Sequence, residues 1–210
     1  MTKIELAKQF AHEAHDSIHQ VRKYTKEPYW VHTDAVADRV ATVPGATDEM
    51  VIAAHLHDVE EDVAPYKKVI PAPERYGLPV NSIYYYDIIA IAAIWGALVT
   101  RYVLDLTDQF TREAYPTWNR ARRKEAERER IGTVPPEVQT IKLCDLVHNT
   151  SSICEHDRDF AKTYLKEKLA LLPKLANGYP PLLQKASDQV IEYSDKLDLH
   201  IMMLYHDVWC

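Results

Sequence analysis

The sequence predicts an all-α fold, and three observations lead to that prediction. Apolar residues recur close to the helical repeat, as at Ile4, Ala7, Ala11 and Ile18 within residues 3–21. No segment alternates apolar and polar side chains over the length of a useful strand. Prolines collect in short segments between the apolar ones, where they exclude long helices and mark loops. With 210 residues, the chain can bury a sizeable core.

The first part of the chain is expected to hold three helices. The first covers residues 3–21, and a loop follows because Pro28 disfavours a helical conformation in the residue before it. A second helix begins near His32. A third starts near residue 48, because Thr47 can cap it and acidic residues follow in its first turn.

The middle of the chain joins a proline-rich segment to an apolar one. Four prolines exclude a long helix between residues 63 and 81, so we expect a surface loop there that could act as a lid. Residues 82–106 are predicted to be helical, and the apolar run 88–99 to be a buried helix because it is too short to span a bilayer. Thr117 or Asn119 can cap the next helix, which carries a basic cluster.

Three further helices are predicted toward the C-terminus. One follows Pro136, and charged helices cover about 157–172 and 181–206. The expected domain organisation is one domain over residues 1–175, with a C-terminal helix within residues 176–210 that packs on this domain or on a partner subunit. A homo-oligomer is therefore possible.

Composition excludes several classes of function. The net charge of −6 and the pI near 5.9 argue against a general nucleic-acid or membrane-surface binder, which needs a positive field. Only five glycines occur, and none form a glycine-rich phosphate loop. The three cysteines lack Cys-x-x-Cys spacing, and the N-terminus lacks the apolar core of a signal peptide. We therefore expect a reduced, cytoplasmic protein.

The stretch from His55 to Asp62 concentrates the chemistry of the chain. On a helix, Glu61 would lie four residues after His57 and Asp62 four after Asp58, so the four side chains would share one side. An imidazole beside a carboxylate suits a divalent cation such as Mn²⁺, Zn²⁺ or Fe²⁺. Glu61 and Asp62 would then serve proton transfer. The alternative is a solvated acidic helix end with incidental histidines.

Other motifs accompany this stretch, in the order Arg22-Lys23, Pro28-Tyr29-x-x-His32, His57-Asp58-x-x-Glu61-Asp62, Tyr76-Gly77, Leu106-Thr107 and Lys142-Leu143-x-Asp145-x-x-x-Asn149. The series resembles the HD phosphohydrolase superfamily and, within it, the (p)ppGpp hydrolase domain of the RelA/SpoT family and its single-domain small alarmone hydrolases. The resemblance spans about residues 5–170. It implies an HD-domain helical bundle, here with a C-terminal helical extension.

The resemblance also implies roles for individual residues. The metal ligands, usually for Mn²⁺ with another divalent metal possible, would be His32, His57, Asp58 and Asp145. Glu61 and Asp62 would be catalytic. The residues that contact substrate would be Arg22, Lys23, Tyr29, Arg120, Arg123, Lys124, Asn149 and Tyr164. Two alternatives stay open, namely that residues 120–124 form a solvated helix face and that Tyr29 is a packed aromatic.

The sequence departs from the family pattern at several places. Where family members commonly have His-x-Gly-Gln, Ser17 and His19 stand in place of the His and the Gly, although Gln20 remains. Thr33 replaces the Pro that often follows the first metal-binding His. The loop that begins at Val63 is longer than usual. These departures leave the predicted metal site intact.

Three functions compete at this stage. The leading hypothesis is a metal-dependent hydrolase that removes the 3′-pyrophosphate from (p)ppGpp to give GDP or GTP. A second keeps the HD site but acts on another nucleotide, such as a (d)NTP, a pyrophosphorylated adenosine nucleotide or a nucleotide phosphate ester. A third is a non-catalytic module that binds an alarmone or acts like an antitoxin, although the pair Glu61 and Asp62 argues against it.

Overall fold

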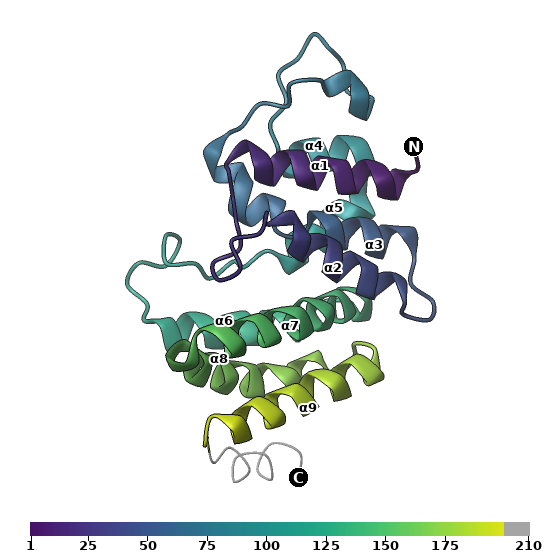
Figure 1. Ribbon diagram of the computed structural model, residues 1–210. Coiled ribbons are helices and arrows are strands. Elements are labelled where there is room, and N and C mark those ends of the chain that lie inside the picture. Colours follow the sequence, from purple (N-terminus) through teal and green to yellow (C-terminus); the bar gives the residue numbers. More distant parts are fainter. Residues whose placement is uncertain (200–210) are drawn as a thin grey trace. The chain divides into compact units, whose positions relative to one another are not determined.

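The computed structural model describes residues 1–199, and these confirm the all-α fold (Figure 1). Within them, extended chain pairs only at two isolated bridges, Val21 with Pro28 and Val69 with Tyr85. The chain divides into two compact units, of which the first is Met1–Thr107 and the second begins at Asp108. The domain boundary expected near residue 175 stays a prediction. No helix in the described part is long and apolar enough to cross a bilayer.

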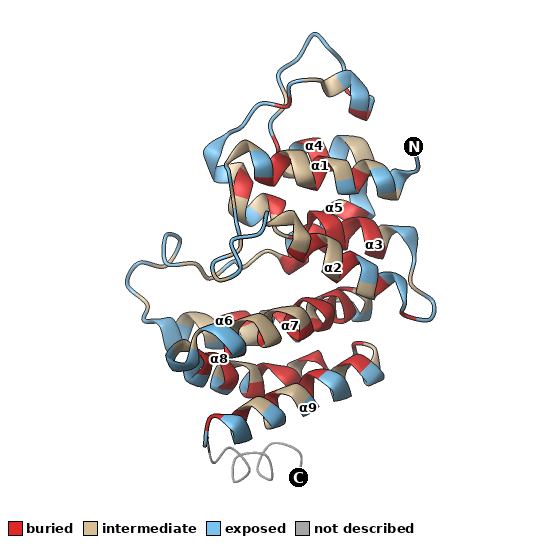
Figure 2. Ribbon diagram, in the orientation of Figure 1, coloured by how far each residue is buried: buried red, intermediate tan, exposed pale blue. Residues whose placement is uncertain are grey.

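The first unit is built around a buried central helix. Its helices are α1 (Lys3–Ser17), α2 (Trp30–Ala41), α3 (Asp48–Leu56), α4 (Ile88–Trp95) and α5 (Ala97–Leu106). Helix α3 packs against α1, α2 and α5, and every residue from Met50 to Leu56 is buried (Figure 2). The predicted start of α3 is confirmed, because the Thr47 hydroxyl accepts from the Met50 amide over 3.3 Å.

Helix α1 is shorter than predicted. Thr2 and Glu5 form a capping box at its start, but the helix ends at Ser17 instead of residue 21. The prediction was wrong because His19 has φ 54°, in the left-handed region that ends an α-helix. The chain then becomes extended, and Val21 pairs with Pro28.

Residues 63–81 contain no α-helix, as predicted, although two short 3₁₀ turns, Ala64–Tyr66 and Pro73–Tyr76, lie in the segment that leads to Ile88. This segment is held on α1 by Glu13, whose carboxylate accepts from the hydroxyls of Tyr76 over 2.7 Å and Tyr86 over 3.2 Å. The idea that this segment acts as a lid stays a prediction.

Residues 82–106 do not form one helix. Asp87 caps α4 by accepting from two backbone amides at 3.0 Å, so residues 82–87 precede the helix. Gly96, with φ 83° and ψ −175°, then separates α4 from α5. The expected burial of 88–99 is also wrong in part, since Ile89 is 69% exposed.

The second unit consists of α6 (Arg120–Ile131), α7 (Pro136–His156), α8 (Arg158–Leu171), the 3₁₀ turn η4 (Leu172–Leu175) and α9 (Pro180–Lys196). Helix α7 is largely buried and packs against α8 and α9 (Figure 2). Asn119, not Thr117, caps α6. The last predicted helix ends at Lys196 instead of 206, since Leu197 caps it and Asp198 has φ 53°. Residues 200–210 lie outside the described residues.

Candidate metal centre

The predicted metal-binding stretch is not a regular helix. Helix α3 ends at Leu56, and a π-helical turn, η1, covers Val59–Val63. The Ala64 amide bonds to the carbonyl of Val59, five residues back, whereas the Asp62 amide bonds to the carbonyl of Asp58 over 2.9 Å. The predicted helical register is therefore wrong at this turn, although Asp58 and Asp62 remain one backbone hydrogen bond apart. Single π turns occur often at functional sites.

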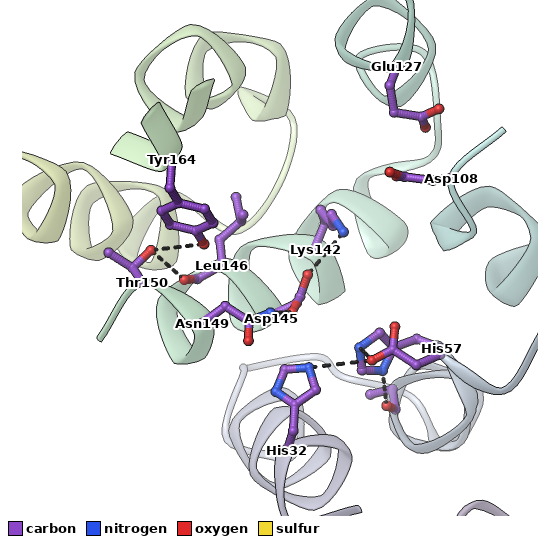
Figure 3. Close-up of polar contacts among 12 residues, drawn as sticks. His32, His57, Asp108, Glu127, Lys142, Asp145, Leu146, Asn149, Thr150 and Tyr164 are labelled. Atoms are coloured by element: carbon purple, nitrogen blue, oxygen red, sulfur yellow. Dashed lines mark hydrogen bonds and ion pairs between the residues drawn. The ribbon is translucent and has the colours of Figure 1, made fainter. Parts of the chain in front are cut away.

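Three of the four predicted metal ligands lie together in the first unit. His57 uses Nδ1 to donate to the carbonyl of Ala54 over 2.8 Å, which aims Nε2 at Asp58. Oδ2 of Asp58 lies 3.0 Å from Nε2 of His57 and 3.6 Å from Nε2 of His32. The ligand nitrogens of His32 and His57 are within 4.8 Å of each other, and both residues are buried (Figure 3).

Tyr29 supports the carboxylate of Asp58. Its hydroxyl donates to Asp58 Oδ2 over 2.8 Å, and its ring lies 4.8 Å from that of His15 between centroids. The guanidinium of Arg22 lies 5.7 Å from the centre of the Tyr29 ring. Lys23, in contrast, is exposed and contacts Tyr24. Tyr29 is thus packed inside the site, where it orients a predicted metal ligand.

Asp62 is held by a pair of residues that the sequence did not identify as a unit. Gln20 Nε2 donates to Asp62 Oδ2 over 2.8 Å, and Gln20 Oε1 lies 2.6 Å from Nδ1 of the buried His15. Burial, and secondly the charge of Asp58, raise the pKa of Asp62 to about 6. Such a carboxylate can exchange a proton near neutral pH.

The remaining acidic residues of the turn differ in their surroundings. Glu61, the other predicted catalytic residue, is exposed on η1. Glu60 faces another way, because its Oε2 accepts from the Ile88 amide at the start of α4 over 2.6 Å. Burial raises the pKa of Glu60. Glu60 therefore ties the turn to α4.

The second unit carries the other predicted site residues. Asp145 is buried on α7, where its Oδ2 lies 3.0 Å from Lys142 Nζ and its Oδ1 accepts from Asn149 Nδ2 over 2.5 Å (Figure 3). Tyr164 on α8 is also buried, with its hydroxyl 3.4 Å from that of Thr150. The Asp145 carboxylate therefore has the polar partners that a buried ionisable group requires.

The basic cluster of α6 is paired with residues outside that helix. Arg120 donates to both carboxylate oxygens of Glu167, over 2.7 and 2.9 Å. Lys124 Nζ lies 2.8 Å from Oδ2 of Asp108, and Arg123 donates to the carbonyl of Trp118. Arg120 is nevertheless exposed, so the choice between substrate contacts and a solvated helix face stays open.

Comparison with known proteins rests on the fold. No protein-family model matches the sequence, and no curated protein matches it. Among solved structures, the chain is similar to one described as a metazoan ortholog of SpoT that hydrolyses ppGpp. The TM-score is 0.70 at 19% identity, with 95% of this chain and 97% of the other covered. The fold resembles that of a SpoT-type ppGpp hydrolase. This confirms, at the level of the fold, the resemblance to HD-domain (p)ppGpp hydrolases.

Within this SpoT-type fold, one departure from the family sequence has a structural explanation. His19 stands where the family pattern has glycine. Its φ of 54° lies in the left-handed region that favours glycine. The residue that contacts Gln20 is His15 and not Ser17, whose hydroxyl donates to the carbonyl of Ala14. A histidine still supports Gln20, from a position that the motif spacing did not indicate.

The donor set in the first unit of this SpoT-type fold fits a divalent metal. His32 and His57 offer imidazole nitrogens and Asp58 offers a carboxylate oxygen, all directed at one small volume. Two nitrogen donors with a carboxylate are typical of sites for Mn²⁺, Fe²⁺ and Zn²⁺. The residues present can therefore hold such a cation.

Proposed function

We propose that this protein is a metal-dependent hydrolase that removes the 3′-pyrophosphate from (p)ppGpp and leaves GDP or GTP. The observation that carries the proposal is the convergence of His32, His57 and Asp58 beside the Asp62 carboxyl, in a chain whose fold resembles that of a ppGpp hydrolase. The same fold can serve several chemistries, so the residues of the site carry the argument for function.

The proposed cofactor is Mn²⁺, held by His32, His57, Asp58 and Asp145. Asp145 is assigned from its place in the sequence motif and from its burial as a carboxylate on α7. A divalent cation supplies Lewis-acid activation of the phosphoryl group and lowers the pKa of water. Tyr29 fixes the orientation of the Asp58 carboxylate.

The proposed catalytic carboxylates are Glu61, which positions the attacking water, and Asp62, which accepts its proton. Gln20 occupies Oδ2 of Asp62, so the Asp62 oxygen that takes the proton from the attacking water is Oδ1. A pKa of about 6 keeps the carboxylate mostly ionised at neutral pH yet basic enough to accept this proton. Glu61, being exposed, assists by orienting the water.

The proposed substrate contacts are the residues that the sequence motifs indicate. Arg22, Lys23 and Tyr29 belong to the first unit, and Asn149 and Tyr164 to the second. Arg120, Arg123 and Lys124 would contact phosphate, where the planar guanidinium of arginine can bind two oxygens at once. The ion pairs of Arg120 with Glu167 and of Lys124 with Asp108 would be exchanged for pairs with phosphate.

Product analysis tests this proposal directly. The Mn²⁺-loaded protein is incubated with ppGpp and, separately, with (d)NTPs, pyrophosphorylated adenosine nucleotides and nucleotide phosphate esters. Release of GDP and pyrophosphate from ppGpp is expected. Glu61→Gln and Asp62→Asn are each expected to lose this release while their metal content stays unchanged. Turnover of another nucleotide, with no hydrolysis of ppGpp, would refute the proposed substrate. Binding of ppGpp without turnover of any nucleotide would indicate a non-catalytic module.

A further inference from the structure

His15, Gln20 and Tyr29 form a connected group in the first unit. The backbone joins them, because the Gln20 amide donates to the His15 carbonyl over 3.1 Å and the Tyr29 amide donates to the Gln20 carbonyl over 3.1 Å. Their side chains are joined as well. His15 Nδ1 lies 2.6 Å from Gln20 Oε1, and the His15 ring lies 4.8 Å from the Tyr29 ring between centroids. The side chain of His15 therefore contacts those of both other residues.

Each of the other two residues orients a different carboxylate. Gln20 Nε2 donates to Oδ2 of Asp62 over 2.8 Å, and the Tyr29 hydroxyl donates to Oδ2 of Asp58 over 2.8 Å. Asp62 is the proposed proton acceptor, and Asp58 is a proposed metal ligand. One imidazole is thus in contact with the supports of both carboxylates.

The directions of these hydrogen bonds place a proton on Nδ1 of His15. An ionised carboxylate only accepts hydrogen bonds, so the NH₂ group of Gln20 faces Asp62 and its Oε1 faces His15. Oε1 is also only an acceptor, and the donor in this contact must be Nδ1. His15 is fully buried, and burial lowers its pKa, so the imidazole is neutral and its Nε2 keeps a lone pair.

Packing alone does not account for a histidine at this position. Among the described residues, the buried Nε2 of His15 has no hydrogen-bond partner. A buried acceptor without a partner costs folding free energy that an apolar side chain would not cost. An apolar side chain could not, however, donate to Gln20. The donor at Nδ1 is therefore the property that distinguishes His15 from a residue that only fills space.

We propose that His15 is a positioning residue that, through Gln20 and Tyr29, fixes the carboxylates of Asp62 and Asp58 relative to each other. The roles of the two carboxylates rest on the proposed function, whereas the contacts of His15 do not. Both carboxylates serve the same attacking water, so their relative position decides whether proton transfer is in reach. A common support on a rigid helix end suits this requirement.

Two substitutions separate the donor of His15 from its ring. His15→Asn keeps an amide donor close to the place of Nδ1 but lacks the ring, and His15→Leu lacks both. In His15→Leu, kcat is expected to fall roughly tenfold with KM unchanged, because the proton acceptor loses its orientation and the substrate contacts remain. His15→Asn is expected to keep kcat within about threefold of the unaltered protein. An equal loss of kcat in the two variants would refute the role of the donor.

Calorimetric titration with Mn²⁺ tests the contact with Tyr29. Both variants lose the ring that packs on Tyr29, so both are expected to bind Mn²⁺ more weakly. His12→Leu is the control, since His12 is a histidine of the same helix that pairs with Asp34 instead. Its affinity for Mn²⁺ and its kcat are expected to stay unchanged. His15→Leu with unchanged kcat and unchanged Mn²⁺ affinity would overturn the proposal.

Nitrogen-15 NMR of the metal-free, histidine-labelled protein tests the arrangement without turnover. His15 is expected to be neutral with its proton on Nδ1, and Gln20→Leu is expected to remove this preference. A proton on Nε2 in the unaltered protein would contradict the proposal, even if His15→Leu failed to fold. The two proposals fail separately. If ppGpp is not hydrolysed, the NMR signals and the Mn²⁺ affinity still decide the role of His15, and full hydrolysis of ppGpp by His15→Leu would reject that role alone.

Discussion

Gln20 and Asp62 are joined by a hydrogen bond of 2.8 Å from the amide Nε2 to the carboxylate Oδ2. His15 lies 2.6 Å from the other end of the same amide, so the amide cannot turn around without losing both contacts. The residues come from the loop after α1 and from the π turn after α3. The orientation of the proposed proton acceptor is thus set by Gln20, which lies far from Asp62 in the sequence and is not itself a proposed metal ligand.

Replacing Gln20 should impair turnover without loss of metal. The bond stabilises the ionised form of Asp62 and lowers its pKa, so Gln20→Leu is expected to raise that pKa and move the acidic limb of the pH–rate profile to higher pH. A hydrogen bond to a charged group corresponds to roughly a tenfold or greater loss of kcat. Ser17→Ala, in the same turn, serves as the control. An unchanged profile in Gln20→Leu would refute the positioning role.

Asp62 should lower the stability of the protein at alkaline pH when no metal is bound. Its pKa of about 6 in the folded state lies above the unfolded value of about 3.9. The folded state therefore holds this proton more tightly, and the resulting stability is present below about pH 4 and lost as pH rises through about 6. Asp62→Asn should raise the free energy of unfolding at pH 8, on the order of 2 kcal/mol, and change it little at pH 4.

Urea denaturation at both pH values, with a chelator present, measures this difference. Asp195→Asn, on α9, controls for the loss of a carboxylate elsewhere in the chain. Destabilisation of Asp62→Asn at pH 8 would mean that the carboxylate contributes to packing and is not held under strain in the site.

The Tyr29 hydroxyl should strengthen metal binding through Asp58. Tyr29→Phe removes the donor to Asp58 Oδ2 and leaves the ring in place. Loss of such a supporting contact typically weakens metal affinity, here by roughly tenfold. Titration with Mn²⁺, followed by electron paramagnetic resonance, measures the affinity, and Tyr24→Phe is the control. Equal affinity of both variants would show that Asp58 needs no such support.

Gly178 should resist substitution for reasons of space. A Cβ at this position would lie 2.7 Å from Leu143 Cδ1 and 3.2 Å from the backbone carbon of Gln139, both on α7. Gly178→Ala is expected to lower the free energy of unfolding by about 1–3 kcal/mol, as overpacking does. Gly132→Ala, whose Cβ would approach Lys174 at 3.3 Å, should cost much less. Thermal unfolding of both variants decides between these outcomes.

Sequence reasoning succeeded where a local signal had one physical meaning. Thr47 followed by two acidic residues identified the start of α3, and prolines correctly excluded an α-helix after Val63. His32, His57 and Asp58 were predicted as ligands and lie together in the first unit. Their contact follows from the packing of α2 on α3, which periodic apolar residues could predict only in part.

The wrong predictions of helix boundaries have a common cause, because each depends on the backbone conformation of a few residues. The left-handed conformation of His19 shortened α1, and Gly96 divided the predicted long helix. The π turn over Val59–Val63 has no clear sequence signal, because the same residues fit a regular helix. The role of His15 was missed because its contact with Gln20 depends on how the chain turns after α1.

Glu60 allows the segment beside the proposed active site to vary in length between related chains. Its bond to the Ile88 amide closes the long segment between Val63 and Ile88 at its base, next to Asp62. Loop-closure entropy rises only slowly with length, by about 0.6 kcal/mol for each doubling. Residues could therefore be inserted or deleted in this segment while the base, and the carboxylates beside it, keep their positions. Related chains could diverge in the length of this segment and so change what reaches the site, while the π turn itself stays the same.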